Sequence, residues 1–139
     1  GEIALLNQVK RDGGPNAERI RQYDYMPFSM LISLIRGAKA TLFPSLYEGF
    51  GLPVLESMAL STAVLTSTGG ALPEVAGEAA VVVDPYDVQA ITRGIQSLDA
   101  DEGLRAHYEA QGVAQASAFS PEAYKERLRA LYDKVGLSA

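Results

Sequence analysis

Short apolar runs alternate with longer amphipathic stretches along most of this chain. The apolar runs are continuous rather than alternating, which indicates strands that are buried on both faces. Between them, apolar residues recur at the spacing of helices that pack on one side. Strands that alternate with helices predict a parallel sheet covered by helices on both faces. The predicted strands cover residues 19–24, 40–43, 63–66 and 79–83, and the predicted helices cover residues 2–10, 28–36, 52–60, 72–75, 87–98 and 101–118, with a last helix from residue 120.

Several helix ends carry sequence signals. Asp87 is a typical N-cap residue, and Pro53 and Pro121 stand where the first turn of a helix tolerates proline. Gly136 is the expected C-terminal stop of the last helix. Residues 11–16 contain glycines and a proline and predict a loop. The expected packing residues are Met30, Leu31, Leu34 and Ile35 in the helix at 28–36, Leu55, Met58 and Ala59 in the helix at 52–60, and Tyr124, Leu128, Leu131, Tyr132 and Val135 in the last helix.

The most informative segment is residues 44–56, where Glu48 and Glu56 flank a Gly-Phe-Gly-Leu-Pro turn. A strand that turns through glycines into a helix leaves backbone N–H groups free at the helix N-terminus. Together with the helix dipole, such groups form an anion site. A carboxylate on each side can accept hydrogen bonds from sugar hydroxyls. A phosphate between two hydroxyl-bearing groups describes a nucleotide sugar.

The position of this segment in the predicted sheet supports the same interpretation. In open parallel sheets, ligands bind beyond the carboxyl ends of the strands. Glu48 follows directly after the predicted strand at 40–43. The topology and the residue types therefore indicate the same edge of the sheet.

Composition limits the classes of function. The chain has 139 residues, 47% of them hydrophobic, which suits one globular α/β domain. Its formal net charge of −5 argues against nucleic acid as a partner. It contains no cysteine and no metal-ligand spacing. No apolar run reaches the roughly 18–20 residues that cross a bilayer, and no start like a signal peptide is seen. We therefore expect a cytoplasmic protein.

The segment at 44–56 resembles the signature of the family 4 retaining glycosyltransferases, the group 1 glycosyl transferases. Seven residues separate the two glutamates, and they include Gly-Phe-Gly-Leu-Pro, as in that family. The resemblance covers residues 19–136, and several separate motifs agree in order. These are Tyr25-Met26-Pro27, residues 34–42, residues 63–67, residues 72–77, residues 81–85 and Phe119-Ser120.

The resemblance implies a fold and a partner domain. It implies the C-terminal, donor-binding half of a GT-B fold, a Rossmann-like three-layer α/β domain with a parallel sheet. On this resemblance, we expect the chain to lack the N-terminal acceptor domain and the first βα unit of the donor domain. In the family that unit supplies an Arg and a Lys that hold the diphosphate. Lys10 and Arg11 stand in the wrong place to replace them.

The resemblance also implies roles for individual residues. Glu48 would accept hydrogen bonds from the donor sugar and act as the catalytic residue, and Glu56 would accept from the ribose hydroxyls. The N–H groups of the turn would face the diphosphate. No metal or other cofactor is required by this design. The implied substrate-binding residues are Gly49, Phe50, Gly51, Leu52 and Glu56, with Tyr25 and Met26 against the nucleotide base.

Some alternatives remain open at this point. Tyr25 and Met26 could instead pack in the core. The last helix, which in the family returns to the acceptor domain, could be partly exposed or could pair with a second copy of the chain. The full-length protein could be peripheral to the inner membrane. Ser61 and Ala63 replace a glycine and a proline of the family pattern, and a left-handed backbone at Ser61 would cost about 1 kcal/mol.

Other functions of parallel α/β domains are the alternatives to transfer of a sugar. The chain could bind a nucleotide sugar without catalysis, or belong to a GT-B domain like that of a sugar-nucleotide 2-epimerase. An epimerase would use acidic and histidine residues that this sequence does not show, and His107 resembles a surface residue. A receiver module would need an aspartate cluster and a lysine at strand ends, where only Asp84 stands.

Overall fold

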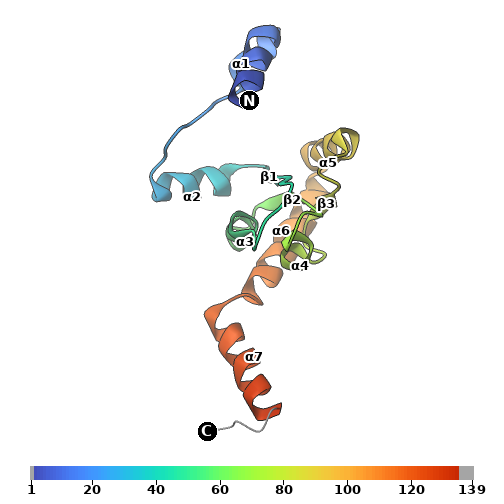
Figure 1. Cartoon of the computed structure of the whole chain (residues 1–139). Helices are drawn as coiled ribbons and strands as arrows, with labels where there is room; N and C mark the ends of the chain where they lie inside the picture. Colours follow the sequence, from blue (N-terminus) through green and yellow to red (C-terminus); the bar gives the residue numbers. More distant parts are fainter. Residues whose placement is uncertain (1, 135–139) are drawn as a thin grey trace. The chain divides into compact units, whose positions relative to one another are not determined.

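The computed structural model describes residues 2–134 (Figure 1). The chain divides into two compact units, Gly1–Met30 and Leu31–Ala139. The first unit contains α1 and a short 3₁₀-helix, η1, and the second contains a parallel sheet and most of the helices. The helices are α1 (Glu2–Asp12), η1 (Gly14–Arg19), α2 (Phe28–Gly37), α3 (Leu52–Ala59), α4 (Leu72–Ala76), α5 (Val88–Ala100), α6 (Glu102–Ser117) and α7 (Pro121–Lys134), and the strands are β1 (Ala40–Phe43), β2 (Ala63–Ser67) and β3 (Val81–Val83).

The sheet has three parallel strands in the order β1-β2-β3. Ala40 is paired with Ala63, and Leu65 is paired with Val81. The strands predicted at 40–43 and 63–66 are confirmed, and the one predicted at 79–83 is shorter. Every residue of β2 is buried, because this strand lies between two neighbours and beneath helices on both faces. The α/β fold class is confirmed.

Two hydrophobic clusters fill the two faces of the sheet. Successive side chains of a strand point to opposite faces, so Val64 and Leu65 belong to different clusters. Val64 packs with Val54 and Met58 of α3 and with residues of α4. Leu65 packs with Leu98 of α5. Burial of these side chains fixes α3 on one face and α5 on the other, and this arrangement sets the direction in which the β1–α3 loop leaves the sheet.

The predicted strand at 19–24 is wrong. The 3₁₀-helix runs through Arg19, and residues 20–27 form no strand. Most side chains from Arg19 to Asp24 are charged or polar and exposed, so the segment has little apolar surface to bury in a sheet. The loop predicted at 11–16 is also only partly right, because α1 continues to Asp12 and the 3₁₀-helix begins at Gly14.

The helix predicted at 28–36 forms, but its apolar stripe is not buried. Within α2, Met30, Leu31 and Leu34 are exposed, and Ile35 is half-buried. Periodicity identifies an apolar face without supplying the surface that covers it. In α3, Met58 is buried as expected and Leu55 is half-buried. Ala59 is exposed, and the other buried residues of this helix are Val54 and Ser57.

The C-terminal helices form where the sequence predicted them, but the packing expected of Tyr124, Leu131 and Tyr132 in the last helix is wrong, because no other element of the described residues buries them. Asp87 caps α5 by accepting a hydrogen bond from the N–H of Ala90 at 2.9 Å. No residue of α7 is buried, and Tyr124, Leu131 and Tyr132 are exposed. The expected stop at Gly136 and the packing residue Val135 lie outside the described residues. Within residues 2–134, no helix is long and apolar enough to cross a membrane.

Candidate functional site

The β1–α3 loop carries the candidate site at the carboxyl edge of the sheet. It runs from Pro44 through Glu48 to Gly51, which is the N-cap of α3. Gly51 has a φ of 89°, in the left-handed region that glycine adopts without strain. Pro53 occupies the first turn of α3, where its missing N–H group removes no helical hydrogen bond. The loop therefore turns sharply from strand into helix, as the sequence predicted.

The turn leaves a row of backbone donors free. The first N–H groups of an α-helix have no partner within the helix. Among the residues that the structure describes, none accepts a hydrogen bond from the N–H groups of Gly49, Phe50, Gly51 or Leu52. These groups lie at the positive end of the dipole of α3. They form a set of unpaired donors at a helix N-terminus, which suits an anion.

Glu48 is held in place by two hydrogen bonds. The hydroxyl of Ser45 donates to Oε1 of Glu48 at 3.0 Å. The backbone N–H of Ala71 donates to the carbonyl oxygen of Glu48 at 3.0 Å. Glu48 is half-buried, so its carboxylate is both oriented and reachable. A carboxylate in this state can accept hydrogen bonds from a bound polyol.

The β2–α4 loop packs against the β1–α3 loop that carries Glu48. A Cβ atom on Gly70 would lie 2.2 Å from the carbonyl oxygen of Glu48, so only glycine permits this approach. Gly70 also has a φ of 60°, which favours glycine. The hydroxyl of Ser67 donates to the carbonyl oxygen of Ser45 and accepts from the N–H of Gly69. Hydrogen bonds and a close backbone contact thus hold the two loops together.

Sequence reasoning missed this second loop as part of the site. Ser45, Ser67, Gly69 and Gly70 carry no charge and no catalytic group. A signal was nevertheless present, since Gly69 and Gly70 follow directly after a buried strand, as the glycines of the β1–α3 loop do. In a parallel sheet, loops after neighbouring strands meet at one edge.

Glu56 lies on the exposed side of α3, five residues after the N-cap. No described residue forms an ion pair or a hydrogen bond with its carboxylate. Glu48, the turn at 49–52 and Glu56 are therefore brought together on one loop and the first turns of one helix. The free carboxylate of Glu56 can accept a pair of adjacent hydroxyls.

Tyr25 and Met26 belong to the first unit, whereas the loop that carries Glu48 belongs to the second. The side chain of Tyr25 is 88% exposed, so its alternative role in core packing is wrong. Met26 is half-buried. Contact of these residues with a nucleotide base stays a prediction.

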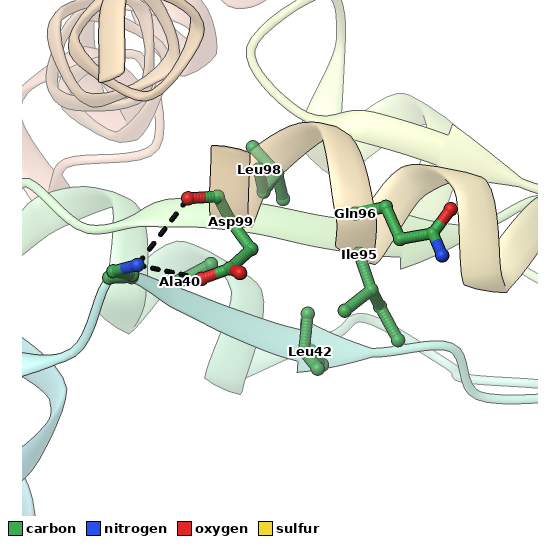
Figure 2. A pocket seen from close by; sticks show the side chains of 7 residues that line it. Ala40, Leu42, Ile95, Gln96, Leu98 and Asp99 are labelled. Carbon is green, nitrogen blue, oxygen red and sulfur yellow. Dashed lines mark hydrogen bonds and ion pairs between the residues drawn. The ribbon is translucent and has the colours of Figure 1, made fainter. Parts of the chain in front are cut away.

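An apolar groove lies between β1 and α5, apart from the loop that carries Glu48. Figure 2 shows the side chains of Leu42 and Ile95 pointing toward one another there. An ion pair between Lys39 and Asp99, with Nζ and Oδ1 2.7 Å apart, stands at one end. The hydrogen bond and the charge of Lys39 hold the pKa of Asp99 below its ordinary value of 3.8. The groove runs along β1 from Lys39 to Leu42, whereas Glu48 lies beyond the carboxyl end of this strand, where parallel sheets bind their ligands.

Among residues 2–134, no group of three or more His, Asp or Glu side chains is placed to hold a metal ion. The donor set of the β1–α3 loop consists of backbone N–H groups and separate carboxylates. The N–H groups can donate to an anion, and the carboxylates can accept hydrogen bonds from hydroxyls.

The pattern of the group 1 glycosyl transferases matches residues 16–115 of this chain. The chain therefore belongs to that family of glycosyltransferases. The matched region contains Tyr25, Met26 and the whole β1–α3 loop. It also contains the supporting loop with Gly69 and Gly70.

Curated relatives of the chain include two bacterial mannosyltransferases. O-antigen chain mannosyltransferase B of Escherichia coli is 44% identical over 103 residues, which cover 74% of this chain and 27% of that protein. MMP alpha-(1->4)-mannosyltransferase of Mycolicibacterium hassiacum is 37% identical over 108 residues, which cover 75% of this chain and 26% of that protein. The chain thus spans about a quarter of the length of these relatives.

A solved structure of similar fold is that of sucrose-phosphate synthase from Thermosynechococcus elongatus. It superposes with a TM-score of 0.77 and 26% sequence identity, and the match covers 94% of this chain and 33% of that one. Both the GT-B assignment and the resemblance to the group 1 glycosyl transferases are confirmed.

Proposed function

We propose that this chain is the donor-binding domain of a retaining glycosyltransferase that takes its sugar from a nucleoside diphosphate. The observation that carries the proposal is the row of free N–H groups at 49–52 beside an oriented Glu48. A diphosphate needs donors and positive potential, and a sugar needs acceptors for its hydroxyls. The β1–α3 loop offers both within a few residues.

The diphosphate is bound by the N–H groups of Gly49, Phe50, Gly51 and Leu52. Negative charge on the diphosphate grows as the bond between the anomeric carbon and the phosphate oxygen breaks. The dipole of α3 and its free donors are fixed before the reaction, so they stabilise this charge with little reorganisation. No metal ion is required for this step.

Glu48 and Glu56 bind the two sugars of the donor. Glu48 accepts from hydroxyls of the transferred sugar and holds its ring while the anomeric bond lengthens. Glu56 accepts from the ribose hydroxyls. In a retaining, SNi-like path, the leaving phosphate oxygen takes the proton of the acceptor hydroxyl, and the new bond forms on the face that the phosphate leaves.

The activities named for the relatives narrow the choice of donor sugar. Two relatives are named as mannosyltransferases, and we propose a mannose nucleotide as the donor and a saccharide or lipid-linked saccharide as the acceptor. The acceptor would be bound by an N-terminal domain that is not in this chain, with catalysis in the full-length protein on the cytoplasmic side of the membrane. The isolated chain would be inactive, because the reaction takes place in a cleft between two domains and this chain supplies only the donor-binding side.

A ligand-observed NMR titration with UDP, GDP and GDP-mannose tests the proposal. We expect saturation transfer to the ribose protons of at least one nucleotide, and its loss in Glu56→Ala. Glu78→Ala is a matched control, because Glu78 is exposed and lies in the turn between α4 and β3, at the other edge of the sheet. Absence of transfer from every nucleotide, in this chain and in the full-length protein, would rule the donor site out.

A second test addresses catalysis in the full-length protein. Glu48→Ala is expected to lower turnover roughly 10- to 100-fold, the effect of losing a charged hydrogen bond to the substrate. Nucleotide affinity should change much less, since Glu48 contacts only the sugar. Normal turnover in this variant would contradict the assigned role.

A further inference from the structure

The turn that carries the free N–H groups has an aromatic anchor. The rings of Phe50 and Phe119 meet edge to face, with centroids 6.0 Å apart and an interplanar angle of 77°. This is the arrangement that aromatic pairs prefer. Phe119 lies between α6 and α7, far from Phe50 in the sequence, and it packs against the cluster formed by α3, α4 and β2. The turn is therefore tied to a fixed part of the core.

Arg127 of α7 holds Phe119 in turn. Its guanidinium carbon lies 5.8 Å from the centroid of the Phe119 ring, within the range of a cation–π contact. Its Nη2 donates to the carbonyl oxygen of Ala118 at 2.8 Å. The bond to Ala118 fixes the guanidinium beside the ring. Phe50, Phe119 and Arg127 thus form a continuous chain of contacts from the turn to α7.

Phe50 needs such an anchor because of its neighbours. It stands between Gly49 and Gly51, and glycines lose more conformational freedom on ordering than other residues. The N–H groups of the turn form no hydrogen bonds to described residues that would fix it. The side chain of Phe50 is still 45% exposed, so its contact with Phe119 restrains it without burying it fully.

We propose that Phe119, held by Arg127, is a positioning residue for the phosphate-binding turn. The edge-to-face contact keeps Phe50 in one orientation, and the N–H groups on either side then converge before an anion arrives. Preorganisation of this kind raises affinity by lowering the ordering cost of binding. The inference rests on the proposed donor site, because it assigns Phe119 a role in that site.

The test compares Phe119→Leu and Phe119→Tyr, with Tyr124→Leu as a control from an exposed position on α7. The first measurement is the ¹⁵N order parameters of the amides at 49–52 in the chain without ligand. We expect them to fall in Phe119→Leu and to be retained in Phe119→Tyr, which keeps the ring. Unchanged order in Phe119→Leu, or an equal fall throughout α6, would overturn the positioning role.

The second measurement is the affinity for UDP and GDP. Phe119→Leu should weaken binding about 3- to 10-fold, the range expected from one aromatic pair. The effect should vanish in a Phe50→Leu background, because Phe119 acts through Phe50. A loss that persists in that background would overturn the inference. If the wild-type chain and the full-length protein bind neither nucleotide while the order parameters respond, the donor-site proposal fails and the aromatic anchor alone stands.

Discussion

The hydroxyl of Ser45 donates to Oε1 of Glu48 at 3.0 Å, and this bond joins the end of β1 to the carboxylate proposed to hold the donor sugar. Ser45 is itself fixed, because its carbonyl oxygen accepts from the buried hydroxyl of Ser67 at the end of β2. The orientation of Glu48 is thus set by two neighbouring strands. A carboxylate on a glycine-rich loop would otherwise sample many orientations.

Removal of the Ser45 hydroxyl should affect turnover more than binding. In Ser45→Ala the Glu48 carboxylate loses one hydrogen bond, worth about 1 kcal/mol, and we expect turnover of the full-length protein to fall about fivefold. Affinity for UDP or GDP should stay the same, since neither the turn at 49–52 nor Glu56 is touched. Steady-state kinetics beside a nucleotide titration measure both quantities. Equal losses in both would show that Ser45 supports the whole loop rather than Glu48.

Gly70→Ala should destabilise the domain by about 2 kcal/mol or more. The new Cβ atom would lie 2.2 Å from the carbonyl oxygen of Glu48, and the left-handed backbone at φ 60° adds about 1 kcal/mol. Urea unfolding followed by circular dichroism measures the change. Gly37→Ala is the control, because no atom lies within 4 Å of its added Cβ. A Gly70→Ala variant as stable as wild type would mean that the two loops separate without cost.

Ser61→Gly should stabilise the domain by roughly 0.5–1 kcal/mol. Ser61 has a φ of 58°, and it is the only residue other than glycine with a positive φ among residues 2–134. The N–H of Ser61 donates to Met58 and that of Thr62 donates to Ser57, which is the pattern of a Schellman motif. Glycine fits its left-handed position without a Cβ penalty.

The control for this variant is Ser61→Ala, which keeps the Cβ atom and should gain nothing. Both variants can be compared by their midpoints of urea unfolding. A stabilised Ser61→Ala variant would show that the serine hydroxyl, rather than the backbone, is unfavourable at the end of α3.

The Ser61 case shows what the sequence could predict and what it could not. Replacement of a family glycine by serine predicted a strained helix end, and the positive φ confirms it. The β1–α3 turn was likewise predicted, because glycines, a proline and a strand all occur within a few residues. Both features could be predicted because the residues that cause them are neighbours in the sequence.

The features that the sequence analysis missed or predicted wrongly have a common physical cause. They depend on contacts between residues that are distant in the sequence. The support of Glu48 by Gly70 and the anchoring of Phe50 by Phe119 depend on how loops meet in space. The apolar stripe of α2 predicted a buried face, but periodicity does not identify a covering surface. The strand predicted at 19–24 failed for a similar reason, since a strand exists only where a partner pairs with it.

The ion pair between Lys39 and Asp99 predicts a pH dependence. The hydrogen bond and the charge of Lys39, with a smaller contribution from Arg105, lower the pKa of Asp99 from 3.8 in the folded chain. A carboxyl group whose folded pKa is depressed contributes stability above its unfolded value. That contribution is lost as the pH falls through the lower, folded value.

A carboxyl-detected ¹³C NMR titration should therefore give Asp99 a midpoint below 3.8. In Lys39→Met the midpoint should return toward the ordinary value, because both main causes of the shift are removed. Asp84, whose carboxylate accepts a backbone hydrogen bond from Tyr86 and has no ion pair among residues 2–134, serves as the internal reference. A midpoint of Asp99 that is the same with and without Lys39 would mean that the pair does not persist in solution, as strongly exposed ion pairs often do not.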